Sequence, residues 1–151
     1  CCSKPFLPLK SYDDLSAFKI YLSDIGLLRE LAGLPPEAIL SGNVVYTEFK
    51  GALAENYVLQ SLVCQIEVLP RYWTSLGKAE VDFIIQLNMD IIPAEVKSET
   101  RLGGKSLSVY DDNYRPAYKI RYSLNNLKMD GNLINIPLYL ADWTVKLVSI
   151  Q

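Results

Sequence analysis

Four charged residues in the middle of the chain have the types and the spacing that hydrolysis of a phosphodiester requires. Asp82 is followed, after twelve intervening residues, by Glu95, and Lys97 comes two positions later, while an earlier acid stands at Glu55. Carboxylate oxygens are the ligands that Mg²⁺ or Mn²⁺ prefers. Such an ion acidifies a bound water and stabilises negative charge on a phosphate. A neighbouring lysine can orient that water or neutralise the developing charge.

The acids would hold the metal in different ways. We expect Asp82 and Glu95 to bind it directly with the backbone carbonyl of Val96, and Glu55 to bind it directly or through water. Burial alone would push these carboxyls toward their neutral form, and a bound cation would reverse that effect. The spacing by itself has low specificity. The alternatives are a surface Glu–Lys pair of little energetic value and a Glu55 on a solvated helix edge.

The elements that must position these residues follow from the hydrophobic pattern. It predicts helices at residues 48–65 and 105–113 and strands at 67–74, 80–87, 91–98 and 117–124. Their order along the chain is helix, three strands, helix and strand. Thr47 is suited to cap the first helix. The short loop at 88–90 predicts an antiparallel hairpin of the second and third strands. The order of elements indicates an α/β domain built in layers.

The remaining segments give weaker signals. The pattern predicts a tether at residues 1–16, a short strand at 18–22 and a helix at 24–32. It also predicts one or two helical turns at 35–42 and a turn at 127–132. Residues 134–140 are apolar, and Pro137 within them indicates an edge strand or an irregular segment. The chain opens without Met, so we expect residues 1–16 to be the tether from a longer protein and residues 17–151 to be the domain.

Side-chain periodicity indicates which faces carry the charges. Glu55 falls within an apolar stripe of its helix, which predicts a carboxylate aimed inward and held by a partner. Strict alternation along a strand places Asp82 on the face opposite to Phe83. Glu95 and Lys97 share one face of the next strand. The tight loop brings the two strands side by side, so Asp82, Glu95 and Lys97 are expected to form one cluster.

Composition limits the classes of function. The chain of 151 residues contains no His, which excludes His-based catalysis and His ligands for zinc. Its three Cys residues lack the spacing of a metal site. No apolar run is long enough to cross a membrane and no signal peptide is evident, so we expect a cytoplasmic protein without membrane contact. The net charge of −2 is not that of a stand-alone nucleic-acid binder.

A local basic patch is compatible with that net charge. Lys78, Arg101 and Lys105 flank the proposed site, and the turn after Ser98 leads into a predicted helix N-terminus, so these four residues could contact a DNA phosphate. The alternative is ordinary solvated charge. The stretch GGKS at 103–106 is not a P-loop, because the pattern needs Gly at position 99, which is Glu. We therefore expect no nucleotide cofactor.

The segments "GKAEVDFII" and "IIPAEVKS", after a helix with an acid, resemble the PD-(D/E)XK nuclease superfamily. The branch with archaeal Holliday-junction resolvases is the most similar. The resemblance implies a restriction-endonuclease-like αβββαβ core with a central mixed sheet flanked by helices. By matching position, Asp82, Glu95 and Lys97 take the motif residues and Glu55 the helix acid. The residue before Asp82 is Val81 instead of the Pro of the motif's name.

A second resemblance extends over nearly the whole chain. The segments "FKIYLSDIGLL", "KGALAENYVLQSL", "YWTSLGKAEVDFII", "IIPAEVKS" and "NIPLYLA", in this order, look like the C-terminal domain of a bacterial and archaeal family of AAA+ ATPase-like proteins. This domain has no known function. The resemblance implies an N-terminal ATPase module as a partner, whose nucleotide motifs are not in this chain.

Two functions follow from these resemblances and residues. The first is a nuclease or nuclease-like DNA-processing domain that depends on Mg²⁺ or Mn²⁺, in which case the chain is a phosphodiester hydrolase. The alternative is a non-catalytic interaction domain that docks on its ATPase module, on another protein or on DNA.

Overall fold

The computed structural model describes residues 1–35, 37, 47–75, 77, 79–99 and 104–150. Its helices are the 3-10 helices η1 (Leu9–Tyr12) and η3 (Leu138–Trp143) and the α-helices α1 (Ile25–Leu31), α3 (Thr47–Val63), α4 (Ser106–Tyr114) and α5 (Thr144–Ser149). Its strands are β1 (Arg71–Thr74), β2 (Glu80–Leu87), β3 (Asp90–Val96), β4 (Lys119–Ser123), β5 (Lys128–Asp130) and β6 (Leu133–Pro137).

In the described residues, the strands form one six-stranded sheet in the order β1-β2-β3-β4-β6-β5. The pairs β1–β2, β2–β3 and β5–β6 are antiparallel, whereas β3, β4 and β6 run parallel to one another. The expected hairpin is confirmed, and Asn88 in its loop has a positive φ of 55°, a conformation that Asn tolerates well. The α/β class and a mixed sheet are therefore confirmed.

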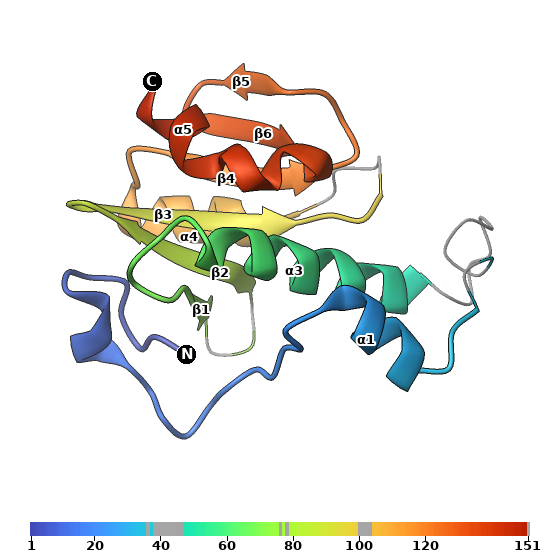
Figure 1. Cartoon of the computed structure of the whole chain (residues 1–151). Helices are drawn as coiled ribbons and strands as arrows, with labels where there is room; N and C mark the ends of the chain where they lie inside the picture. Colours follow the sequence, from blue (N-terminus) through green and yellow to red (C-terminus); the bar gives the residue numbers. More distant parts are fainter. Residues whose placement is uncertain (36, 38–46, 76, 78, 100–103, 151) are drawn as a thin grey trace.

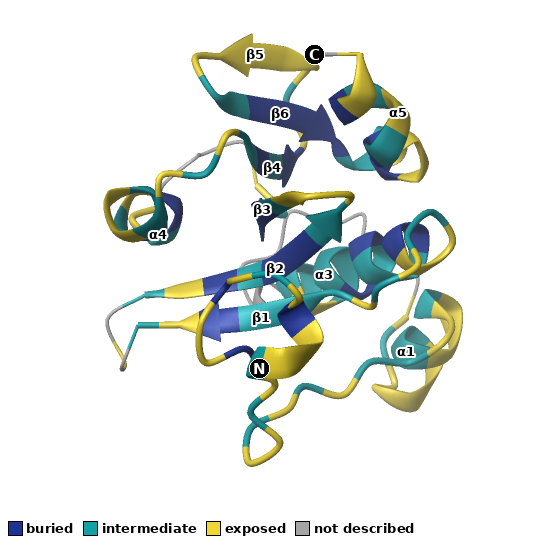
Figure 2. Ribbon diagram, turned by 90° about the vertical axis from the view of Figure 1, so that its left-hand side faces the viewer, coloured by how far each residue is buried: buried dark blue, intermediate teal, exposed yellow. Residues whose placement is uncertain are grey.

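Helices cover both faces of this sheet (Figures 1 and 2). Helices α3, η3 and α5 pack on one side, which we call the α3 face, and α4 packs on the other, the α4 face. The core of the α3 face includes Val58, Leu62, Phe83, Ile85, Ile92, Ala94, Ile120, Tyr122, Ile134 and Ile136. The core of the α4 face includes Leu9, Trp73, Val81, Ile84, Leu107 and Tyr110.

Local chemistry explains where several elements start and stop. The side chain of Asp24 caps α1 by accepting the N–H of Leu27 at 2.9 Å, as its residue type predicts. Arg115 takes the left-handed conformation with φ of 47° and ends α4. Strand β1 begins at Arg71, four residues later than predicted. Pro70, just before it, lacks the N–H that a ladder requires.

Two expectations near the C-terminus were only partly right. The segment at 127–132 contains the exposed strand β5 and is not only a turn, because it pairs with β6. Strand β6 in turn has a neighbour on each side and is not an edge strand. Pro137 is tolerated because it is the last residue of β6, where the chain passes into η3.

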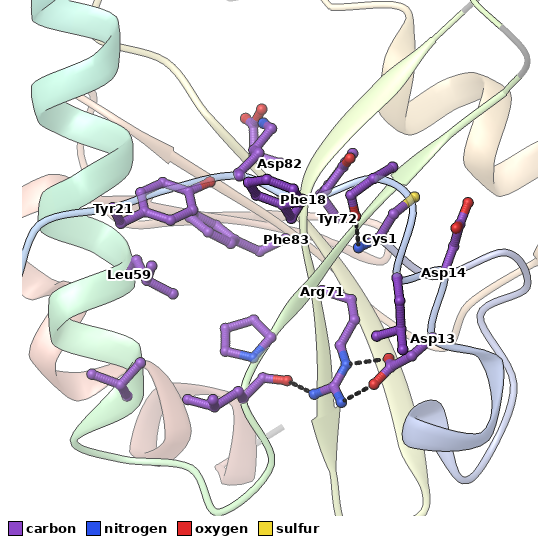
Figure 3. A pocket seen from close by; sticks show the side chains of 16 residues that line it. Cys1, Asp13, Asp14, Phe18, Tyr21, Leu59, Arg71, Tyr72, Asp82 and Phe83 are labelled. Atoms are coloured by element: carbon purple, nitrogen blue, oxygen red, sulfur yellow. Dashed lines mark hydrogen bonds and ion pairs between the residues drawn. The ribbon is translucent and has the colours of Figure 1, made fainter.

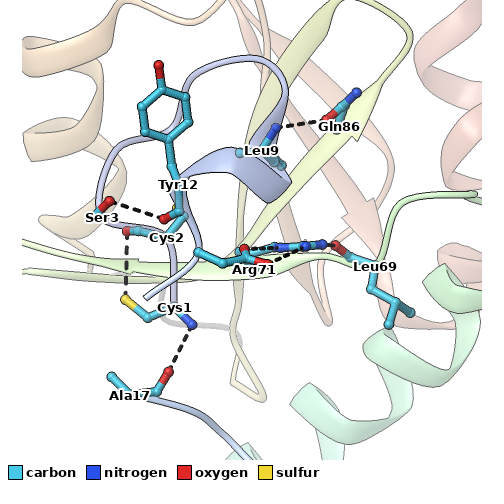
Figure 4. Close-up of polar contacts among 10 residues, drawn as sticks. Cys1, Cys2, Ser3, Leu9, Tyr12, Ala17, Leu69, Arg71 and Gln86 are labelled. Atoms are coloured by element: carbon cyan, nitrogen blue, oxygen red, sulfur yellow. Dashed lines mark hydrogen bonds and ion pairs between the residues drawn. The ribbon is translucent and has the colours of Figure 1, made fainter. Parts of the chain in front are cut away.

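Residues 1–16, expected as a tether, pack against the sheet (Figure 4). The N–H of Cys2 donates to the carbonyl of Tyr72 at 2.9 Å. Leu9 is fully buried, and its N–H donates to the side-chain oxygen of Gln86 on β2 at 3.2 Å. Further on, residues 17–22 have no regular secondary structure and belong to no ladder, so the strand predicted at 18–22 is wrong. We call residues 17–22 the strap. The helical turn predicted within 35–42 lies largely outside the described residues.

Candidate functional site

Strand β2 carries an extra residue beside the predicted catalytic acid. Arg71 of β1 pairs with Ile84, and Trp73 pairs with Val81. The one residue between the paired positions on β1 therefore lies opposite two residues on β2. This bulge interrupts the alternation of side chains. As a result Asp82 and Phe83 both face α3 instead of opposite sides, which corrects the prediction from strict alternation.

The carboxylate of Asp82 is held where β2 and β3 separate. The regular pairing of the two strands reaches Phe83 and Ala94, and beyond it the Oδ2 of Asp82 accepts the backbone N–H of Val96 at 2.8 Å. Burial raises the pKa of Asp82 to about 6, the Val96 N–H opposes that rise, and the nearby Glu55 adds to it. Asp82 is therefore a half-buried acid that titrates close to neutral pH.

Glu55 of α3 is engaged by the strap. Its Oε1 accepts hydrogen bonds from the ammonium of Lys19, at 3.0 Å, and from the hydroxyl of Tyr21. The same ammonium lies 2.6 Å from Glu80. Burial alone would lower the pKa of Lys19, but the hydrogen bonds to Glu80 and Glu55 raise it overall. Glu55 thus points inward and has a partner, as expected, and that partner is a cation from the chain itself.

Glu95 projects to the α4 face. It alternates along β3 with Ala94, which packs on the α3 face, and the residue is only 1% exposed. Its Oε1 lies 2.8 Å from the Lys97 ammonium, which confirms that these two side chains share a face. On the neighbouring strand Arg121 stands directly beside Glu95, with its Nε 3.7 Å from Oε2. Gly104 also abuts this group, since a Cβ there would lie 2.7 Å from the same oxygen.

The pairing of Glu95 with Arg121 is incomplete. Across the described residues, Oε2 of Glu95 and Nε of Arg121 are buried atoms that make no hydrogen bond. A buried polar atom without a partner is costly, so this contact calls for an explanation.

The predicted site residues therefore do not converge. Asp82 lies with Glu55 on the α3 face, and Glu95 lies with Lys97 on the α4 face, and among the described hydrogen bonds the peptide of Val96 joins the two groups. In the parts of the chain that the structure describes, no group of three or more acidic, His or Cys side chains is placed to hold a metal ion. The donors, as arranged, do not fit one shared Mg²⁺ or Mn²⁺, because the bulge turns Asp82 away from Glu95.

The predicted phosphate-binding residues are only partly described. Ser98 is half-buried in the bend just after β3, and Lys105 is exposed immediately before α4. Lys78 and Arg101 lie outside the described residues. Contact of these four residues with a nucleic acid stays a prediction, as do the catalytic roles of the acids and of Lys97.

A cavity of about 350 Å³ opens on the α3 face beneath the strap (Figure 3). Phe18, Lys19 and Tyr21 of the strap line one side of it, and Asp82 and Phe83 of β2 line another.

An ion pair holds the far side of the cavity. Arg71 donates from Nε and Nη2 to the two carboxylate oxygens of Asp13, at 2.8 and 2.9 Å (Figure 3). The hydrogen bond with Arg71 lowers the pKa of Asp13. The pair thus stays ionised and ties the N-terminal segment to β1.

Sequence reasoning missed Lys19, Tyr21 and Arg121. The first two alternate with apolar neighbours in the sequence FKIYL, a period-2 pattern that places both on one face of an extended segment. This pattern could have identified both residues from the sequence. Nothing in the sequence indicated that Arg121 would stand in register with Glu95, because the register of parallel strands depends on the crossover between them.

Comparison with known proteins defines the family and not the function. None of the helices in the described parts of the chain has the length and apolar character that crossing a bilayer requires. No curated protein and no solved structure gives a significant match. A protein-family profile described as a domain of unknown function (DUF4143) matches residues 50–140. Because this match covers more than half of the chain, the chain belongs to the DUF4143 family.

Proposed function

We propose that this chain is a non-catalytic interaction domain with a nuclease-like fold, and that it docks on the ATPase module of the larger protein that its sequence resembles. The order α3-β1-β2-β3-α4-β4 supports the fold assignment, since it repeats the αβββαβ order of the PD-(D/E)XK superfamily. The observation that carries the functional proposal is the division of the acids between two faces of the sheet.

Each half of the divided set is already neutralised by a cation of the chain. Glu55 has the ammonium of Lys19 at 3.0 Å, and Glu95 has that of Lys97 at 2.8 Å. A metal that bridged Asp82 and Glu95 would have to displace these contacts and reverse the bulge. A domain that binds a partner needs neither change, so the arrangement favours binding over metal-dependent hydrolysis.

Calorimetry tests this proposal. The chain is titrated first with Mg²⁺ and Mn²⁺ and then with the separately produced ATPase module. We expect no saturable metal binding below millimolar concentrations and a measurable heat with the ATPase module. Tight metal uptake without binding to that module would overturn the proposal.

A metal-dependent nuclease is the second candidate, and one specific observation favours it. Asp82 and Glu95 are joined through a single peptide, and Oε2 of Glu95 is buried without a hydrogen bond. If the bulge were reversed and Asp82 turned toward Glu95, a cation between them would supply that oxygen with a partner. Mg²⁺ or Mn²⁺ would then be held by Asp82 and Glu95, with Lys97 beside them.

Cleavage assays decide this second candidate. Branched, single-stranded and duplex DNA and single-stranded RNA are incubated with the chain and Mn²⁺. Glu95→Gln and Asp82→Asn serve as matched isosteric variants. Cleavage that both variants abolish supports the nuclease, whereas cleavage that survives in both, or no cleavage of any substrate, eliminates it.

A further inference from the structure

The cavity beneath the strap is mainly apolar. Leu59 and Val63 of α3 line it together with Phe83 of β2, and its volume of about 350 Å³ is within the range of small ligand sites. Figure 3 shows Asp82 and the ring of Tyr21 close together at one end of this space. A mostly apolar pocket with a single polar end is a common form of binding site.

Asp82 is the carboxylate in this cavity that is least engaged. Of the other two acids that line it, Asp13 makes a bidentate pair with Arg71, and Asp14 accepts two hydrogen bonds from Ser16. Among the described contacts Asp82 has one hydrogen bond, from the Val96 N–H, and no ion pair. Its second oxygen is thus available to a ligand, and a donor there would be favourable.

The cations around the cavity are already bound to other groups. Lys19 pairs with Glu55 and Glu80, and Arg71 pairs with Asp13. The amino group of Cys1 donates to the carbonyl of Ala17 at 3.0 Å. With Glu55 and Glu80 included, five acidic groups stand against three cationic ones around the cavity, so its potential favours a positively charged ligand.

The rim of the cavity offers apolar contacts to a partner. Phe18 and Leu15 line the cavity and are yet 73% and 87% exposed, and Ile20 of the strap is 81% exposed. Exposed apolar side chains that gather at one place usually mark an interaction surface. A ligand that fits this rim carries apolar groups on either side of its charge.

We propose that this cavity receives a basic side chain of a partner protein, a Lys or Arg flanked by apolar residues, with its charge on Asp82 and its neighbours on Phe18 and Leu15. The inference rests on the proposed interaction role and adds the chemistry of the partner. Recognition of this kind combines one apolar anchor with one directed charge.

Three small probes of the same shape test the charge preference. 2-Phenylethylamine is cationic, 2-phenylethanol is neutral, and 3-phenylpropanoate is anionic. Each is titrated into the ¹⁵N-labelled chain at pH 7.5 while the amide signals are followed by NMR. We expect the amine to bind at least about tenfold more tightly than the alcohol and to shift the amide signals of the strap and of Phe83. We expect the anion to bind most weakly of the three.

Matched variants assign the preference to Asp82. Asp82→Asn keeps the shape and still accepts the Val96 N–H, so the tenfold preference for the amine should vanish. Asp112→Asn removes an exposed charge from α4, on the far side of the sheet, and should keep that preference. Equal affinities for amine and alcohol, or a preference that persists in Asp82→Asn, would overturn the inference.

Binding of the ATPase module to the wild type and to Asp82→Asn separates the role of the cavity from that of the whole domain. If the ATPase module binds the wild type and Asp82→Asn equally well, the interaction role stands and the cavity is not its docking point. If the amine binds through Asp82 but the module does not bind, the cavity site stands and the module is not the partner.

Discussion

The two carboxylate–lysine groups of this domain contain the same residue types but are held in different ways. On the α4 face, Glu95 is buried, and its cations come from Lys97, directly after the end of β3, and from Arg121 on the adjacent strand in register. On the α3 face, Glu55 is half-buried and its cation comes from the strap, which belongs to no ladder. The first group is fixed by the sheet, while the second depends on a segment attached mainly through side chains.

This difference has an energetic consequence. Removing one partner from a buried pair leaves an uncompensated charge and costs about 3–5 kcal/mol. A half-exposed pair contributes about 1 kcal/mol or less, because water replaces the lost contact. We therefore expect Glu95 and its cations to contribute mainly to stability, and we propose recognition as the role of the group around Glu55 and Asp82.

The largest expected effect belongs to Glu95. Glu95→Ala leaves Arg121 largely buried without a counter-charge, and it should lower the free energy of unfolding by about 3 kcal/mol. Urea denaturation measures the change. Glu99→Ala, at an exposed position four residues later, should change stability by less than about 0.5 kcal/mol. Equal effects of the two substitutions would show that the Glu95 group does not stabilise the sheet.

The contact of Gly104 with Glu95 gives the next effect. A methyl group at position 104 would meet both carboxylate oxygens at 2.7 and 2.8 Å. Gly104→Ala should therefore destabilise the domain by about 2 kcal/mol, because the buried carboxylate would have to move away from Lys97 and Arg121. Gly51 in α3 has open space around it, so Gly51→Ala should stabilise by about 1 kcal/mol. Thermal unfolding measures whether each variant has a lower or a higher Tm than the wild type. A higher Tm for Gly104→Ala would contradict this packing.

Asp82 should show a stability effect that depends on pH. Its pKa is raised to about 6 by burial, partly offset by the Val96 N–H, with Glu55 and Glu95 adding to the rise and Lys19 opposing it. A raised carboxyl pKa means that the folded state binds the proton more tightly than the unfolded state. The ionisation of Asp82 therefore lowers the free energy of unfolding as pH rises from about 4 to about 6.

Asp82→Asn removes this penalty. It should raise the free energy of unfolding by about 2 kcal/mol at pH 8 and by little at pH 4. Urea titrations of both proteins at the two pH values provide the test. A variant that is less stable than the wild type at pH 8 would show that the carboxylate is stabilised by charge and not penalised by burial.

The smallest effect is expected for the strap. Lys19→Met should cost about 1 kcal/mol or less, since the group is half-exposed. It should however increase amide hydrogen exchange of residues 18–22 severalfold. Lys10→Met, at an exposed position in η1, should leave that exchange unchanged. Protection that is identical in both variants would mean that Lys19 does not hold the strap.

Much of the fold followed from local patterns, whereas the site did not. The hairpin and α4 were predicted to within two residues, because turn residues and apolar periodicity are local signals. Glu95 and Lys97 were assigned correctly to one face for the same reason. The side of Asp82 was wrong because a bulge is set by the pairing of β2 with β1, which a single strand's alternation does not reveal.

Paramagnetic relaxation by Mn²⁺ tests most directly the claim that Asp82 and Glu95 do not share a metal. The ion broadens the amide signals near it, so a shared site would broaden the signals around Asp82 and Glu95 together and saturably. We predict only weak, unsaturable broadening at exposed acids, unchanged by Asp82→Asn and by Glu95→Gln. Saturable broadening centred on Val96, lost in both variants, would contradict this account and restore the nuclease.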